Sequence, residues 1–168
     1  MAHTIEIPEA ASKTDIYDLV LKQIDFLLQD EDNIIANIAN ISSVLKHSLQ
    51  NVIWAGFYFF EPDKNELVLG PFQGNLACTR IKYGQGVCGK ALERKETIVV
   101  EDVEKFPGHI YCDTSSRSEI VVPLIVNGIP KGVLDLDSGI IGNFDDSDKM
   151  YLEKLVKKIE HLFDNYPK

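Results

Sequence analysis

Apolar side chains recur at intervals of three and four residues in the N-terminal part of the chain. Two such stripes lie within residues 14–50, separated by a short acidic stretch, and each is typical of an amphipathic helix. Thr14 or Asp15 is well placed to cap the first helix, because both side chains accept hydrogen bonds from free helical N–H groups. Residues 1–13 show no such period and are predicted to form an extended lead-in.

After residue 51 the pattern changes to runs rich in aromatic and β-branched residues, which are typical of strands. Turn-forming residues separate the first two runs, and the Asn127-Gly128 pair, a strong hairpin signal, separates the last two. One segment after a cluster of glycines has helical spacing instead. The predicted elements are strands at residues 52–60, 66–72, 97–100, 120–126 and 129–137, and a short helix at residues 87–94.

A final amphipathic helix is predicted within residues 145–163, with Asp145 or Ser147 as its cap. The order of elements predicts a single α+β domain over residues 1–168. In this arrangement a central antiparallel sheet, within residues 52–137, carries the long helices on one face. The short helix and a long loop lie on the other face, where we expect a ligand pocket beneath them.

The residues with distinctive chemistry gather in one irregular stretch. All three cysteines lie between Cys78 and Cys112, around a glycine-rich turn at residues 84–89. The loop at residues 101–118 shows no steady period, and a structureless loop of this length in a compact domain is more often functional than idle. We therefore expect this stretch to carry thiol redox chemistry on a small ligand.

The chain of 168 residues is acidic, with a formal net charge of −9. This charge disfavours binding to nucleic acid and to anionic membranes. No apolar run is long enough to span a bilayer, and no basic segment followed by an apolar run indicates a signal peptide. An odd number of cysteines without a secretion signal is typical of a reducing compartment, so we expect a cytoplasmic protein.

A free cysteine is by default a small buried hydrophobic residue. Two positions argue against that interpretation here. Cys112 lies within a polar loop, and Cys88 begins a predicted helix, where unpaired N–H groups and the helix dipole favour the thiolate. These local features make Cys88 the most acidic of the three thiols.

A zinc site made of the three cysteines and His109 is the next alternative. The spacing opposes it, because Cys78 and Cys88 lie ten residues apart and the chain has no closely spaced cysteine pair. A Cys-x-x-Cys motif is absent as well, so the signature of thioredoxin-type oxidoreductases is missing. Metal-free thiol chemistry is the preferred hypothesis. His109 lies three residues before Cys112 and could tune its thiol, but a loop histidine is more often solvated, and solvation is the expectation here.

Three carboxylates are candidates for a binding site. Asp135 and Asp137 lie two apart on a predicted strand and share a face, and Glu119 opens the neighbouring strand. A solvated sheet face is the alternative, but the flanking residues are apolar, and a buried carboxylate needs a cationic partner such as the ammonium of a free amino acid. Clustering also raises carboxyl pKa values, which favours a proton donor. Trp54 and Tyr58 share one face of the first strand, as core aromatics or as a pocket wall.

Several short blocks between Val52 and Phe144 form a recognisable set of motifs. They are Trp54-Ala55-Gly56-Phe57-Tyr58, Leu69 to Gly74, Ala77-Cys78, Gly84 to Ala91, Phe106 to Ile110 with Cys112, Ser116 to Leu124, and Gly132 to Asp137. This set resembles the GAF domain family and, more closely, the free methionine-R-sulfoxide reductases. A generic GAF domain has no reason to carry all three cysteines at these positions, so the resemblance is specific.

The resemblance implies a GAF-like fold and a reductase that converts free L-methionine-R-sulfoxide to methionine. It implies that Cys112 attacks the sulfoxide, that the resulting sulfenic acid forms a disulfide with Cys78, and that thioredoxin restores the thiols. Cys88 is implied as a further redox-competent thiol, and its position at a helix start keeps it as the alternative nucleophile. No bound cofactor is implied.

The resemblance also implies that Glu119, Asp135 and Asp137 bind substrate and take part in catalysis, with Trp54 and Tyr58 around the methyl-sulfoxide end. It leaves the oligomeric state open, although GAF domains often pair as homodimers through terminal helices. The alternative from another class of protein is a non-catalytic GAF sensor that binds a small ligand or reports oxidation through its cysteines.

Overall fold

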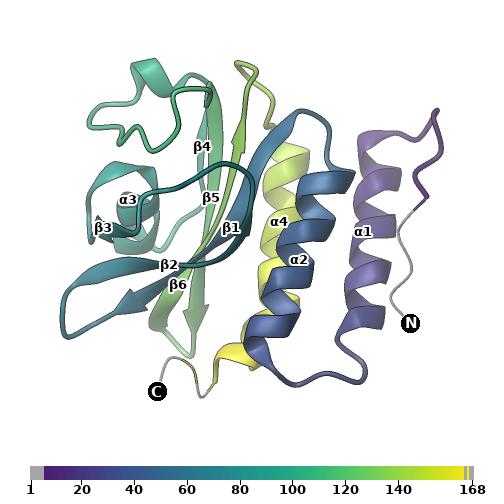
Figure 1. Ribbon diagram of the computed structural model, residues 1–168, viewed down its shortest axis with the longest axis horizontal. Helices are drawn as coiled ribbons and strands as arrows, with labels where there is room; N and C mark the ends of the chain where they lie inside the picture. The colour runs from purple at the N-terminus through teal and green to yellow at the C-terminus, as the bar shows by residue number, and fades with distance from the viewer. Residues whose placement is uncertain (1–5, 165, 167–168) are drawn as a thin grey trace.

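The structure, a computed structural model, describes residues 6–164 and residue 166. Within this part of the chain, six strands form one sheet in the order β3-β2-β1-β6-β5-β4, and all neighbouring strands are antiparallel (Figure 1). The strands are β1 (Val52–Glu61), β2 (Glu66–Gln73), β3 (Arg80–Lys82), β4 (Ile98–Val100), β5 (Ser118–Val126) and β6 (Ile129–Ser138). The predicted α+β architecture with a central antiparallel sheet is confirmed.

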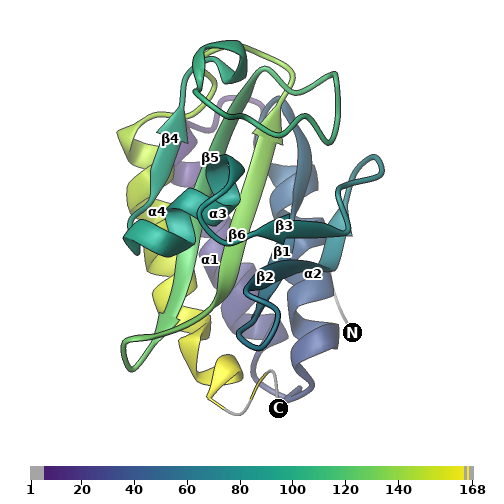
Figure 2. The same cartoon turned by 90° about the vertical axis from the view of Figure 1, so that its left-hand side faces the viewer.

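Three long helices cover one face of the sheet, and one shorter helix lies on the other (Figures 1 and 2). The long helices are α1 (Lys13–Leu27), α2 (Ile34–Ser48) and α4 (Asp146–Ile159). Helices α2 and α4 lie against the sheet, and α1 packs outside them. Helix α3 (Gly86–Arg94) crosses the opposite face, and two short 3₁₀ helices, η1 (Val103–Lys105) and η2 (Glu160–Phe163), follow β4 and α4.

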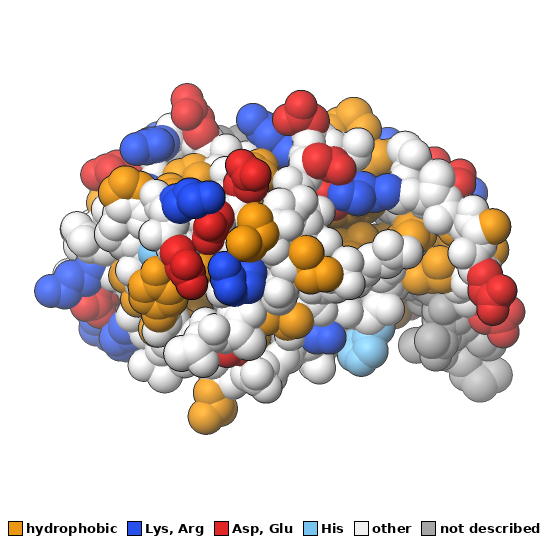
Figure 3. Space-filling view, turned by 90° about the horizontal axis from the view of Figure 1, so that it is seen from above, with side chains coloured by type: hydrophobic (Ala, Val, Ile, Leu, Met, Phe, Trp, Pro, Cys, Tyr) orange, Lys and Arg blue, Asp and Glu red, His pale blue; other side chains and the backbone are white. Residues whose placement is uncertain are grey.

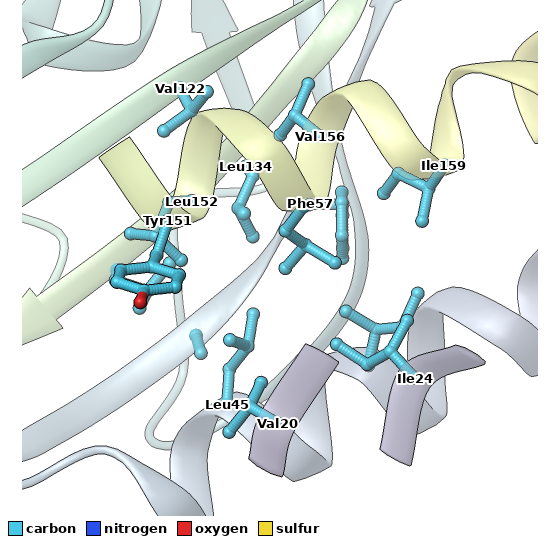
Figure 4. Close-up of a cluster of buried hydrophobic side chains, with 14 of the residues drawn as sticks. Val20, Ile24, Leu45, Phe57, Val122, Leu134, Tyr151, Leu152, Val156 and Ile159 are labelled. Carbon is cyan, nitrogen blue, oxygen red and sulfur yellow. The ribbon is translucent and has the colours of Figure 1, made fainter. Parts of the chain in front are cut away.

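The main hydrophobic core lies between the sheet and the long helices (Figure 4). Leu45 of α2, Leu152 of α4, and Phe57 and Leu134 of the two central strands are completely buried there. Full burial of each such side chain contributes roughly 1.5–3 kcal/mol. The central strands are therefore held firmly from this side, and they form a fixed floor for any site on the opposite face.

A smaller apolar cluster holds α3 on that opposite face. Val87, Ala91 and Leu92 of the helix are buried with Val121 of β5 and Val133 of β6. This contact covers only part of the sheet. The remaining area is covered by the loop between β2 and β3 and by the long loop between η1 and β5 (Figure 2).

The helix caps differ in part from the prediction. Ser12, not Thr14 or Asp15, caps α1: its hydroxyl accepts from the Asp15 N–H, and the Asp15 carboxylate accepts from the Ser12 N–H. The prediction was wrong because Asp15 completes a capping box as its third helical residue instead of opening the helix. At α4, Asp145 is the cap, as predicted, and Asp148 completes the same kind of box.

Strand β3 was not predicted, because three residues are too few to show an alternating pattern. It pairs with β2, and Arg80 there contacts the carboxylates of Glu66 at the start of β2 and Glu61 at the end of β1. Strand β5 begins at Ser118, two residues before the predicted start. The part of the predicted lead-in at residues 1–5 lies outside the described residues.

The end of the molecule seen in Figure 3 carries acidic, basic and hydrophobic side chains in a mixed arrangement. Among the helices of residues 6–164, none combines the length and the apolar character that a bilayer span requires.

Candidate active site

A disulfide joins two loops on the α3 side of the sheet. Cys78 lies in the connection between β2 and β3, and Cys112 lies in the long loop between η1 and β5. Their Cα atoms are 5.2 Å apart across a sequence separation of 34 residues. The third cysteine, Cys88, is free and buried.

The three carboxylates singled out from the sequence lie next to one another on β5 and β6. Glu119 is directly opposite Asp137 in the β5–β6 ladder, and Asp135 follows two residues away on the same face of β6. All three line one pocket together with Cys112. Glu119 and Asp135 are each only 6% exposed, so this is a buried cluster and not a solvated sheet face.

Burial raises the pKa of all three carboxyl groups. For Glu119 and Asp135, the nearby charge of Asp137 raises the pKa further. The pKa of Asp137 is raised to about 6; a hydrogen bond from the Ser116 hydroxyl and the proximity of His109 act in the opposite direction. No lysine or arginine is among the described residues that line this pocket. Negative charge there must therefore be balanced by protons or by a cationic ligand.

Cys88 lies in the first turn of α3, and its side chain points into the carboxyl cluster. Its Sγ atom lies 3.3 Å from Oδ2 of Asp135 and 4.0 Å from Oε1 of Glu119. Burial raises the pKa of the Cys88 thiol well above its usual value, and the neighbouring carboxylates add to this effect. The expectation that the helix start favours the Cys88 thiolate is therefore wrong. Burial beside anionic groups outweighs the helix dipole.

His109 reaches from the long loop into the same pocket. Its side chain is 5% exposed, and Nε2 lies 2.9 Å from Oε2 of Glu119. Burial lowers the pKa of His109, and the charge of Asp137 partly opposes that shift. The expectation of a solvated loop histidine is therefore wrong. The one feature of the sequence that indicated a role for His109 in the site was its position three residues before Cys112.

An aromatic wall on β1 and β2 bounds the pocket. The ring of Trp54 stacks on Phe72 with centroids 5.3 Å apart, and the Trp54 and Tyr58 centroids are 6.0 Å apart. The indole N–H of Trp54 donates to the carbonyl oxygen of Asn75 at 3.1 Å, which fixes the ring orientation. A Cβ atom on Gly56 would lie 2.6 Å from the Trp54 ring, so the glycine makes room for it. Such a wall suits a methyl group or a sulfur atom.

The pocket has a volume of about 40 Å³ in this disulfide-bonded state. That is space for roughly three water molecules. Ile110 and Cys112 of the long loop and Leu76 and Ala77 of the β2–β3 loop line it, so the two bonded loops form its cover. This volume is smaller than a ligand the size of a free amino acid.

The site thus combines a pair of cysteines in disulfide contact, buried carboxyl groups with raised pKa values, and an aromatic wall. A thiol pair of this kind can take up oxidising equivalents and release them by thiol–disulfide exchange. The carboxyl groups can supply a proton or bind a cation. The arrangement is suited to redox chemistry on a small cationic ligand.

Comparison with known proteins gives the family. Residues 38–164 match the GAF domain family. The chain is 48% identical over 161 residues to GAF domain-containing protein A of Dictyostelium discoideum, covering 96% of this chain and 100% of that protein. It is 46% identical over 151 residues to the free methionine-R-sulfoxide reductase of Escherichia coli (strain K12), covering 90% of each chain.

A solved structure shows the same relationship in three dimensions. The X-ray structure of the free methionine-R-sulfoxide reductase from Neisseria meningitidis, in complex with its substrate, matches with a TM-score of 0.91 at 46% identity, covering 96% of each chain. The fold and family implied by the sequence motifs are confirmed. The chain belongs to the GAF domain family and, within it, to the free methionine-R-sulfoxide reductases.

Proposed function

We propose that this protein reduces free L-methionine-R-sulfoxide to methionine through its cysteine thiols. The observation that carries the proposal is the Cys78–Cys112 disulfide at the mouth of a pocket of buried carboxyl groups. The identity of 46% to the Escherichia coli reductase over 90% of the chain supports the same activity.

Cys112 is the proposed attacking thiol, because it lines the pocket whereas Cys78 is not among the lining residues. Its thiolate attacks the sulfoxide sulfur, and the oxygen is transferred overall from substrate to the Cys112 sulfur. The products are methionine and a sulfenic acid. The Cys78 thiol then attacks that sulfur, forms the disulfide and releases water. Cys88 also lines the pocket and is the alternative attacking thiol.

The carboxyl cluster is the proposed source of the proton for the sulfoxide oxygen. A thiolate attack on sulfur leaves negative charge on that oxygen, and a neutral carboxyl group nearby can donate to it. Burial raises the pKa of Glu119 and Asp135 well above the usual value, which favours their protonated forms. Glu119, which also contacts His109, is our first candidate for the donor.

Recognition of a free amino acid follows from the charge and the shape of the site. The substrate ammonium offsets the negative charge of the cluster, and Asp137, with a pKa of about 6, is the carboxyl group best suited to be ionised at neutral pH. The methyl-sulfoxide end is proposed to lie against Trp54 and Tyr58, whose rings form the apolar side of the pocket.

Regeneration of the thiols requires a dithiol partner, for which we propose thioredoxin. Exchange with a thioredoxin dithiol would break the Cys78–Cys112 bond in two steps through a mixed disulfide. Such recycling belongs to a reducing compartment, so we propose a cytoplasmic location. A homodimer formed through terminal helices is the proposed assembly, by analogy with other GAF domains.

The activity is tested by incubating the protein with free methionine-R-sulfoxide and dithiothreitol and measuring methionine. Absence of turnover at millimolar substrate would contradict the proposal and favour a GAF sensor. The roles of the thiols are tested under single turnover with a sulfenic-acid trap and mass spectrometry. In the Cys78→Ser variant the sulfenic acid is expected to persist on Cys112. A sulfenic acid that still forms in Cys112→Ser would instead assign the attack to Cys88.

A further inference from the structure

Three potential metal ligands lie close together in the pocket that Cys112 lines. Cys88 Sγ and one carboxylate oxygen each of Glu119 and Asp135 all lie within 4.8 Å of one another, and all three residues are buried. They come from three different elements, α3, β5 and β6, so the grouping is set by the fold and not by a local motif. The three-cysteine site rejected from the sequence is a different set, since Cys78 and Cys112 are bonded to each other.

The spacing of these atoms matches tetrahedral coordination. Zinc bonds to sulfur at about 2.3 Å and to carboxylate oxygen at about 2.0–2.2 Å, so a sulfur and an oxygen ligand of one ion lie roughly 3.5 Å apart. The observed distances from Cys88 Sγ are 3.3 Å to Asp135 and 4.0 Å to Glu119, which bracket this value. Shifts of a few tenths of an ångström would complete the geometry, with a fourth position open toward the pocket.

Two polar features indicate that the cluster lacks a cation. Oδ1 of Asp135 is buried and has no hydrogen-bond partner among the described residues. No lysine or arginine is present among the described lining residues. His109 already holds Oε2 of Glu119 at 2.9 Å, which leaves Oε1 directed toward Cys88. A histidine that orients a ligating carboxylate in this way is a common outer partner in metal sites.

The size of the closed pocket favours an ion over an organic ligand. Its volume of about 40 Å³ accommodates a metal ion with a bound water, whereas a free amino acid is larger than this volume. A mixed sulfur and oxygen ligand set with imidazole support suits zinc better than magnesium or calcium.

We propose that Cys88, Glu119 and Asp135 bind one Zn²⁺ ion, with His109 positioning Glu119, and that the ion excludes the sulfoxide substrate. The exclusion of substrate rests on the proposed function, because the ion would occupy the place where the substrate interacts with Glu119 and Asp135. Zinc would then act as a reversible inhibitor whose proposed ligands do not include Cys78 or Cys112. No redox step is involved.

Binding is tested on the oxidised protein, in which Cys88 is the single free thiol. Titration with Co²⁺ is expected to give one equivalent with a thiolate-to-metal charge-transfer band, and Zn²⁺ should displace the cobalt. The Cys88→Ser variant should lose the band and lower the zinc affinity on the order of 100-fold or more, and His109→Gln should lower it about 10- to 100-fold. His161→Gln, a change at an exposed histidine that hydrogen-bonds only within its own turn, is the matched control and should bind normally.

This measurement uses neither substrate nor turnover, so it stands even if the proposed activity fails. A band that persists in Cys88→Ser, or no band in the oxidised wild type, would overturn the site. Competition is tested separately by steady-state reduction with and without free Zn²⁺ buffered by a chelator. Zinc should raise the apparent KM at least about tenfold at saturation, and a chelator should restore it fully. If the protein binds cobalt but its KM does not change with zinc, the proposed inhibition would be overturned and the metal site would stand.

Discussion

Nε2 of His109 lies 2.9 Å from Oε2 of Glu119, and this contact links the long loop to the floor of the pocket. Both side chains are almost completely buried, at 5% and 7% exposed. Nδ1 of the same ring is buried and has no partner. The loop that carries Cys112 is therefore attached to the sheet at a polar point close to the disulfide as well as through the disulfide itself.

Replacing His109 with leucine is expected to lower kcat/KM for sulfoxide reduction by about 10- to 100-fold. The reason is that a hydrogen bond to an ionisable buried group is worth about 1.5–3 kcal/mol, and its loss leaves Glu119 without its partner. His109→Gln is the matched variant, because the glutamine amide can donate from nearly the position of Nε2. Steady-state kinetics of both variants test the role. Equal losses in the two would show that the ring fills space and does not position Glu119.

The tight approach of α3 to the preceding turn gives a second prediction. A Cβ atom on Gly89 would lie 2.4 Å from the carbonyl oxygen of Lys82 and 3.0 Å from the nitrogen of Gly84, and both are backbone atoms. Gly89→Ala must therefore shift α3, and with it Cys88. We expect a loss of about 1–3 kcal/mol in the free energy of unfolding, measured by urea denaturation.

Gly139→Ala is the control for that experiment. The nearest atoms to a Cβ there are 3.6 Å and 3.7 Å away, which is ordinary contact distance. Its effect should stay within about 0.5 kcal/mol. If Gly89→Ala were as mild as this control, the helix would have room to adjust, and the position of Cys88 would not depend on that glycine.

Regular patterning predicted most of the fold, because each long element repeats its period several times. The runs from Val52 onward are rich in aromatic and β-branched residues and end in clear turns, so β1, β2, β5 and β6 were found within two residues of their ends. The same period placed Asp135 and Asp137 on one face, where both line the pocket. By contrast, β3 has only three residues and offered no pattern.

The electrostatics of the site could not be predicted from local sequence. The helix start at Cys88 suggested a thiolate, but the pKa depends on burial and on Asp135, which is 47 residues away along the chain. Likewise, His109 lies in a loop without periodicity, and its contact with Glu119 follows from how that loop folds back. The sequence motifs identified Cys88 and His109 as candidates, but the groups that contact them are known only from the folded structure.

Reduction of the disulfide is expected to loosen the cover of the pocket. Cys78 and Cys112 join the two covering loops, and the long loop has few regular backbone hydrogen bonds between η1 and β5. Amide hydrogen exchange in residues 106–115 should accelerate at least about tenfold after reduction, while β5 and β6 stay protected. The Cys78→Ser variant should show the fast exchange without any reductant. Identical exchange in both redox states would mean that other contacts, such as the one at Glu119, keep the loop closed.

Asp137 provides a prediction about pH and stability. Its pKa in the folded protein is about 6, above the ordinary value of 3.8, chiefly because it is buried. The folded state therefore holds this proton more tightly than the unfolded state, so the contribution of Asp137 to the free energy of unfolding should rise as the pH falls through 6 and level off below about 4.

In Asp137→Asn this contribution should disappear. The asparagine oxygen can still accept the hydrogen bond from Ser116, and the loss of charge also relieves Glu119 and Asp135, whose pKa values Asp137 raises. At pH 8, with a chelator present, the variant should be more stable than the wild type by on the order of 1–3 kcal/mol. The difference should shrink toward zero near pH 4. A constant difference across this range would mean that Asp137 keeps one charge state throughout, and that its negative charge in the folded protein is already balanced.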